Sequence, residues 1–175
     1  RSQGREDDGR KVLEALIAAE PQAAAAHHAL GLLLVRQGQR AAALSALEKA
    51  ARFAPEDPRF AFVHAVALHD DGQVGVAASV LENALMRHPG DFDLRSFYAN
   101  LLLEQGEKQA ARVQAETLQR LFPQDRRVEA LLRAGSGVWQ AIEPWMGGLL
   151  VLALMAIPAR WLWQTRREVK PRKGL

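Results

Sequence analysis

The sequence contains no cysteine among its 175 residues. Disulfide bonds, thiolate metal sites, cysteine nucleophiles and covalently attached c-type haem are therefore excluded from this chain. Glycine-rich phosphate loops, nucleophile elbows and zinc-protease motifs are also missing. The first residue is arginine rather than methionine, so we expect a processed or truncated start from which any export signal has been removed.

The five histidines are poorly spaced for binding a metal ion. His27 and His28 are adjacent and so point to different faces of a helix, while His64 and His69 are five residues apart. We expect His88 to be favoured as a cation near a helix C-terminus. The sequence therefore predicts no catalytic residue, no metal site and no cofactor, and indicates that the protein is not an enzyme.

The net charge of +3 is unevenly distributed along the chain. Six basic residues and one acidic residue follow residue 159, so the tail is strongly basic and the rest of the chain is slightly acidic. A nucleic-acid-binding domain needs a basic patch on its folded surface, and none is indicated here. We expect no nucleic-acid partner.

Six kinds of residue recur every 34 positions between residues 24 and 125. They are Leu34, Leu68 and Leu102; Gly38, Gly72 and Gly106; Ala43, Ala77 and Ala111; Pro55, Pro89 and Pro123; Asp57, Asp91 and Asp125; and the small residues Gly31, Ala65 and Ala99. A fixed period of this length marks a stacked-repeat architecture.

Each period divides into two helices around its glycine. Glycine supplies a left-handed C-cap that ends the first helix, and proline prevents the second helix from continuing. The aspartates are placed to cap the helix that follows each proline. The predicted helices are 10–20, 24–37, 40–53, 59–71, 74–87, 92–105, 108–121 and 126–134.

This pattern resembles three consecutive tetratricopeptide repeats, which implies an all-α helix-turn-helix solenoid. We expect a flexible lead-in at 1–9 and full repeats at 24–57, 58–91 and 92–125. The segment 10–23 is expected to be the second helix of a repeat whose first helix is absent, and 126–134 to cap the array. The family's early aromatic is replaced by His27, Ala61 and Arg95, and its last small residue by Leu118 in the third repeat, departures that weaken individual packing contacts.

The resemblance also implies a groove on the first helices that binds other protein subunits. Its positions here are His28, Leu32, Val35, Arg36, Arg59, Phe62, Val63, Val66, His69, Asp70, Asp93, Phe97, Asn100, Leu103 and Glu104. The lysine and asparagine clamp of chaperone-binding members is absent, since those positions are His28, Leu32, Val63, Asp93 and Phe97. An apolar, aromatic centre favours an amphipathic helix or an extended apolar segment as the ligand. The alternative is that neighbouring helices of the chain itself cover Leu32, Val66 and Phe97.

The segment after the linker 135–143 has the composition of a membrane span. No charge occurs from 144 to 159, and an apolar stretch extends to 163 if Arg160 reaches the interface. Trp139 and Trp145 mark one boundary, and Trp161 and Trp163 the other, as an aromatic belt would. We predict a transmembrane helix at 144–163 in a lipid bilayer, followed by a basic tail at 164–175. The alternative is a buried core helix.

The basic tail predicts a cytoplasmic C-terminus by the positive-inside rule. We therefore expect a bacterial inner-membrane protein with periplasmic repeats, acting as an accessory or assembly subunit of a complex. Residues 59–72 also resemble repeats attached to bacterial multihaem cytochromes, which suggests an electron-transfer or cytochrome-related setting. The alternatives are a tail-anchored adaptor of an organelle outer membrane with cytosolic repeats, a removable sorting signal at 143–167, and an enzyme whose catalytic part lies upstream.

Overall fold

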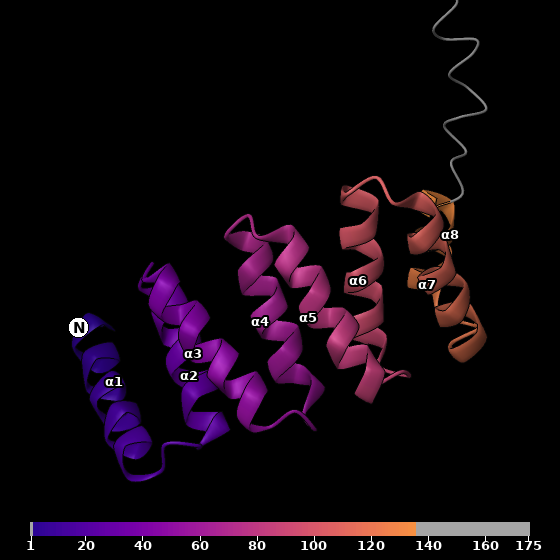
Figure 1. The fold of residues 1–175 in the computed structure, drawn as a ribbon. Coiled ribbons are helices and arrows are strands. Elements are labelled where there is room, and N and C mark those ends of the chain that lie inside the picture. The colour runs from indigo at the N-terminus through magenta and orange to yellow at the C-terminus, as the bar shows by residue number, and fades with distance from the viewer. Residues whose placement is uncertain (1, 136–175) are drawn as a thin grey trace, which may run out of the picture. The chain divides into compact units, whose positions relative to one another are not determined.

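A computed structural model describes residues 2–135, in which every regular element is an α-helix (Figure 1). The helices follow one another in chain order, and each packs against the next. They are α1 (Ser2–Ala19), α2 (Ala24–Arg36), α3 (Arg40–Phe53), α4 (Pro58–Asp70), α5 (Val74–Arg87), α6 (Phe92–Glu104), α7 (Lys108–Leu121) and α8 (Arg126–Gly135). The all-α repeat fold predicted from the 34-residue period is confirmed for this part of the chain.

The second helices α3, α5 and α7 have the bounds that the sequence predicts. The first helices α2, α4 and α6 each end one residue earlier than predicted, and α4 begins at Pro58. Proline is well suited to the first helical position, because its missing N–H has no intrahelical partner there. Asp57, Asp91 and Asp125 accept hydrogen bonds from the backbone of the helices that follow them, as predicted.

The three turn glycines adopt the left-handed backbone that their positions require, with φ values of 72°, 81° and 80° for Gly38, Gly72 and Gly106. The residue after each glycine donates its N–H to a carbonyl five residues earlier. These bonds are Gln39 to Leu34 (2.9 Å), Gln73 to Leu68 (2.9 Å) and Glu107 to Leu102 (2.8 Å). Each first helix therefore ends in the same Schellman-type arrangement.

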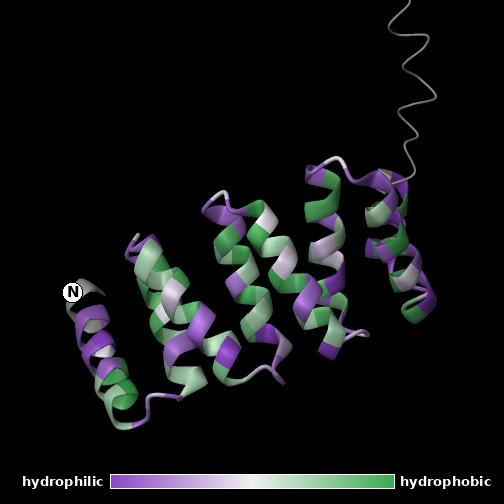
Figure 2. Cartoon of the chain, viewed as in Figure 1, coloured by the Kyte–Doolittle hydropathy of each residue, from purple (hydrophilic) through white to green (hydrophobic). Residues whose placement is uncertain are grey.

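The flexible lead-in predicted over 1–9 is helical from Ser2 onward, because α1 begins there. Two ion pairs involve this extension. Glu6 binds Arg36 of α2 at 2.8 Å, and Asp8 lies 3.8 Å from Lys11 of α1. Figure 2 shows that α1 is mainly hydrophilic towards its start and hydrophobic towards its end. The prediction failed because it considered the local composition and not the partner on α2.

Small residues allow the two helices of each repeat to pack closely. A Cβ atom added at Gly31 would lie 2.6 Å from the side chain of Leu47, so α2 and α3 meet there without space for a methyl group. Ala65 and Ala99 occupy the equivalent positions and are fully buried. Leu47, Leu81 and Leu118 of the second helices are fully buried.

The predicted transmembrane helix at 144–163, its flanking tryptophans and Arg160, and the tail at 164–175 all lie outside the described residues. Within residues 2–135, no helix is both long and apolar enough to cross a membrane.

Candidate functional site

Four of the predicted groove residues form one connected cluster between α4 and α6. The ring centroids of Phe62 and Phe97 are 5.7 Å apart, and His69 packs edge-on against Phe97, also at 5.7 Å. The Nε2 atom of His69 lies 2.9 Å from a carboxylate oxygen of Glu104. We call these four residues the aromatic cluster. It links the first helices of repeats two and three, which are adjacent in space although 34 residues apart in sequence.

The electrostatics of the aromatic cluster favour a charged imidazole. The hydrogen bond to Glu104 raises the pKa of His69 above its ordinary value, and Asp70, 3.6 Å away, acts in the same direction. Partial burial of the ring opposes these effects. The cluster therefore combines two apolar rings with an ion pair at its edge.

Other predicted residues lie on the same two helices, and Val66 and Asn100 are three or four positions from members of the aromatic cluster. Val63, Val66 and Leu103 are half-buried, while Asn100 is exposed. Phe97 is itself half-buried, because α4 covers part of its ring. The chain's own helices thus cover Phe97 and Val66 only in part.

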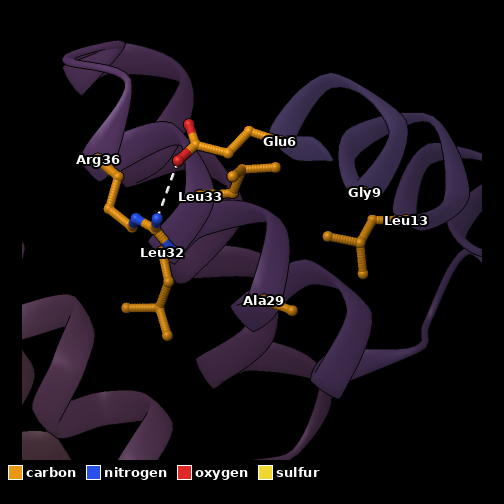
Figure 3. Close-up of a pocket in the computed structure, with 7 residues that line it drawn as sticks. All are labelled: Glu6, Gly9, Leu13, Ala29, Leu32, Leu33 and Arg36. Carbon is orange, nitrogen blue, oxygen red and sulfur yellow. Dashed lines mark hydrogen bonds and ion pairs between the residues drawn. The ribbon is translucent and has the colours of Figure 1, made fainter. Parts of the chain in front are cut away.

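Three predicted residues of repeat one line two hollows and do not belong to the aromatic cluster. Leu32 and Arg36 line a hollow of about 530 Å³ between α1 and α2, across which Arg36 pairs with Glu6 (Figure 3). Val35 and Asp70 line a smaller hollow of about 240 Å³ beside α3. Leu32 remains 42% exposed, so the described helices cover it only in part.

His28 and Arg59 are occupied in contacts within the protein. The His28 ring packs on Phe60 with a centroid distance of 4.9 Å, and its buried Nδ1 has no hydrogen-bond partner among the described residues. Burial, followed by the nearby Arg59 charge, lowers the pKa of His28. Arg59 forms an ion pair with Asp57 at 2.6 Å. The structure therefore places both residues at the junction of α2 and α4 and outside the aromatic cluster.

Three side chains that the sequence analysis did not assign to partners hold the loops between repeats. His27 donates to the carbonyl of Pro21 at 2.9 Å, and Arg95 donates to that of Pro89 at 2.6 Å. Ala61, at the equivalent position, is too short, and His88 bonds to Pro55 at 2.9 Å instead. His27 and Arg95 therefore have a role in holding these loops that the sequence analysis did not predict. The signal was available in the sequence, since each is a hydrogen-bond donor six residues after a proline.

The described residues contain no group of three or more histidine, cysteine, aspartate or glutamate side chains that could hold a metal ion. What the first helices do present is half-buried apolar rings next to an ion pair. This combination suits the binding of an apolar segment that carries polar groups.

Paired antiparallel helices repeated with a 34-residue period define an α-helical repeat protein. A tetratricopeptide repeat model matches residues 1–66 and 68–135. The chain therefore belongs to the tetratricopeptide repeat family.

No curated protein matches the chain. Among solved structures, MamA shares 17% identity with a TM-score of 0.65, over 78% of this chain and 81% of that one. YrrB, described as a repeat protein with an unusual peptide-binding site, shares 16% identity with a TM-score of 0.58, over 77% and 78%. The first repeat domain of Spaghetti (RPAP3), solved with an HSP90 peptide, shares 21% identity with a TM-score of 0.58, over 69% and 94%. At these identities the likeness concerns the fold.

Proposed function

We propose that this tetratricopeptide protein is a non-enzymatic scaffold that binds protein partners at the aromatic cluster and holds them at a bacterial inner membrane. The observation that carries the binding proposal is that Phe62 and His69 of α4 pack against Phe97 of α6. His69 also pairs with Glu104 of α6. The rings offer apolar area, and the His69–Glu104 pair can orient the polar groups of a ligand. The ligand we expect is an amphipathic helix or an extended apolar segment of another subunit.

Two of the similar structures support a peptide-like ligand. YrrB is described with a peptide-binding site, and the Spaghetti domain was solved with an HSP90 peptide. The lysine and asparagine clamp expected for a chaperone carboxylate is missing here, so we propose a different, more apolar ligand for this chain.

The membrane proposal rests on the sequence from 144 to 175. The uncharged stretch from 144 to 159 and the tryptophans on either side of it have the character of a membrane span. The basic tail favours a cytoplasmic C-terminus and therefore periplasmic repeats. We propose that the protein is an accessory or assembly subunit, and the similarity of residues 59–72 to multihaem-cytochrome repeats favours an electron-transfer complex.

Site-specific photo-crosslinking tests the binding surface. A photoreactive amino acid at Asn100, which is exposed next to the aromatic cluster, should capture a specific protein in membranes of the native host. The matched control is the same group at Met86, which is 73% exposed on the second helix α5. Equal capture at both positions, or none at Asn100, would contradict the proposal.

The absence of cysteine makes the membrane topology directly testable. One cysteine introduced at the exposed Gln119 should react in intact cells with a thiol reagent that cannot cross the inner membrane. A cysteine introduced at position 174, in the tail, should react only after the cells are opened. The reverse pattern would place the repeats in the cytosol, as in the tail-anchored adaptor.

A further inference from the structure

Between the second helices α3 and α5 lies a hollow of about 770 Å³, to which α4 contributes Ala61, His64 and Leu68. These three residues lie three and four positions apart and therefore share one face of α4. Phe62 and His69 of the aromatic cluster lie on another face of that helix. We call the hollow the Ala61 groove. It is a second surface, separate from the aromatic cluster.

In the next pair of second helices, α5 and α7, the equivalent space is filled by a side chain of the protein itself. Arg95 stands 34 positions after Ala61, and it donates to the side chain of Gln114 on α7 and to the carbonyl of Pro89. Gln114 is in turn the equivalent of Val80, which lines the Ala61 groove. Alanine at position 61 therefore leaves open the space that a guanidinium group occupies one repeat later.

The charged residues that line the Ala61 groove are mainly basic. Arg52 and Arg87 lie in the last turns of α3 and α5, and neither forms an ion pair with a described residue. Their equivalents one repeat later are Met86 and Leu121, so this pair of cations is specific to the Ala61 groove. Among the described residues of the lining, only Glu48 carries a negative charge, so the net charge of the groove is positive. An anionic ligand is therefore favoured.

His64 presents an unused polar group to the groove. It is 8% exposed and lines the hollow, yet no described residue forms a hydrogen bond with its ring. A buried polar group without a partner costs free energy, which a ligand bound at the ring recovers. The equivalents of His64 are Leu30 and Tyr98, so the other repeats do not present an imidazole here. The ring is placed to bond with a carbonyl or carboxylate oxygen that enters the groove.

The end of the Ala61 groove away from the arginines is apolar. Val76, in the first turn of α5, is 50% exposed, and Leu44 and Val80 are half-buried. Val76 and Val80 precede Arg87 by about 16 and 10 Å along α5, at the rise of an α-helix. An extended chain advances about 3.3–3.6 Å per residue, so about three to five residues span this distance.

We propose that the Ala61 groove binds an extended, acidic segment of a partner protein. An aspartate or glutamate of this segment lies about three to five residues from a large apolar residue. The carboxylate binds at the end where Arg52 and Arg87 lie, and His64 donates to a backbone carbonyl of the segment. The apolar side chain covers Val76 and Val80. A helix of about 10 Å diameter is too wide for a space whose counterpart one arginine fills, so the segment is extended.

A peptide library displayed on phage tests this proposal. The library is first depleted on the Ala61→Arg variant, in which arginine fills the groove as Arg95 fills the next space. It is then selected on the unmodified full chain, and we expect the selected peptides to share an acid and a large apolar residue at the stated spacing. If circular dichroism shows that Ala61→Arg is not folded, Arg87→Glu takes its place, because Arg87 is exposed.

A selected peptide, synthesised with a fluorescent label, gives the affinity by fluorescence anisotropy. Arg87→Glu should weaken binding about tenfold or more, since repulsion replaces a charge-assisted contact. The Arg87→Glu variant should also prefer a peptide in which lysine replaces the acid. Arg120→Glu is the matched control, because Arg120 is the exposed equivalent of Arg52 on α7 and lies outside the groove. This variant has the same change of charge and should leave the affinity unchanged.

The proposal is overturned if selection on the unmodified chain enriches no peptide, or enriches basic or uncharged peptides. Undiminished affinity of Ala61→Arg or Arg87→Glu for the selected peptide would also overturn it. So would displacement of the peptide by an equal concentration of hexanoate, since the groove would then hold a small carboxylate and not a protein segment. Sedimentation that shows a dimer of the unmodified chain, dissociated by Arg87→Glu, would also overturn it, because a second copy would then occupy the groove.

Discussion

His69 of α4 and Glu104 of α6 are joined by a hydrogen bond of 2.9 Å, so the first helices of two repeats are linked by a pair that can titrate. Glu104 raises the pKa of His69. A raised pKa means that the folded state binds the proton more tightly. The stabilisation that the His69–Glu104 pair provides is fully present below the unfolded-state pKa of His69, about 6.5. It is lost as the pH rises through the folded-state pKa.

We predict that Glu104→Gln lowers the pKa of His69, measured by NMR titration of its ring protons. The variant should also lose less stability than the unmodified protein between pH 6 and pH 8 in urea denaturation. Glu116→Gln is the control, because Glu116 pairs with Arg112 on α7 and is remote from His69. An unchanged His69 titration in Glu104→Gln would show that the pair does not form in solution.

His64 should have the opposite pH dependence. It is buried on α4, and loss of hydration lowers its pKa, although Glu48 partly offsets this effect. The unfolded chain therefore takes up a proton at a higher pH than the folded one, and stability falls as the pH drops below about 6.5. We predict that His64→Gln loses less stability than the unmodified protein does between pH 7 and pH 5.

Glu48, whose charge raises the pKa of His64, allows a second test of the same prediction. Removing its charge in Glu48→Gln should lower the pKa of His64 further and make the acid loss of stability steeper. Urea midpoints at the two pH values measure both effects. If His64→Gln and the unmodified protein lose stability in parallel, His64 is not the group responsible.

Gly31 of α2 lies against Leu47 of α3, which leaves no room for a methyl group there. Because Leu47 is fully buried and cannot move aside freely, Gly31→Ala should destabilise the protein by about 1–3 kcal/mol. Gly75→Ala is the matched control. Gly75 lies in α5, and a Cβ atom added there has open space around it. Because alanine has a higher helix propensity than glycine, this substitution should stabilise the protein by up to about 1 kcal/mol. Thermal unfolding, monitored by circular dichroism, shows whether each substitution lowers or raises the melting temperature.

Asp91 caps α6 by accepting a hydrogen bond of 2.8 Å from the backbone N–H of Leu94. Replacing it by alanine leaves that N–H without its partner, and we expect a loss of about 1 kcal/mol. Asn also accepts this bond, so Asp91→Asn should retain most of the stability. Equal losses for alanine and asparagine in urea denaturation would show that the cap does not contribute.

The helix boundaries could be predicted from the sequence because their signals are local. Gly38 ends α2 through its own backbone conformation, and Pro55 prevents α3 from extending, so neither depends on distant residues. The first residues of α1 were predicted wrongly because they depend on a distant residue. Glu6 is held by Arg36, thirty residues further along the chain, and local composition does not reveal that pair.

The candidate site could be predicted only in part. The resemblance to a known family indicated which positions lie on the first helices, and Phe62, His69, Phe97 and Glu104 do meet there. It did not separate them from His28, which packs beneath Phe60. Whether a residue on the groove face of a first helix is exposed depends on the size of the side chains that the next helix places against it.

The sequence by itself determined the repeat architecture. Glycine and proline recur every 34 positions and specify the helix ends, and small residues with the same period allow close helix contacts. It also determined that chemistry requiring cysteine is excluded. Only the tertiary structure decided which apolar positions remain uncovered. Leu16 and Ala50 share one register, yet Ala50 is buried and Leu16 is 43% exposed, because burial depends on the neighbouring helix and not on the residue itself.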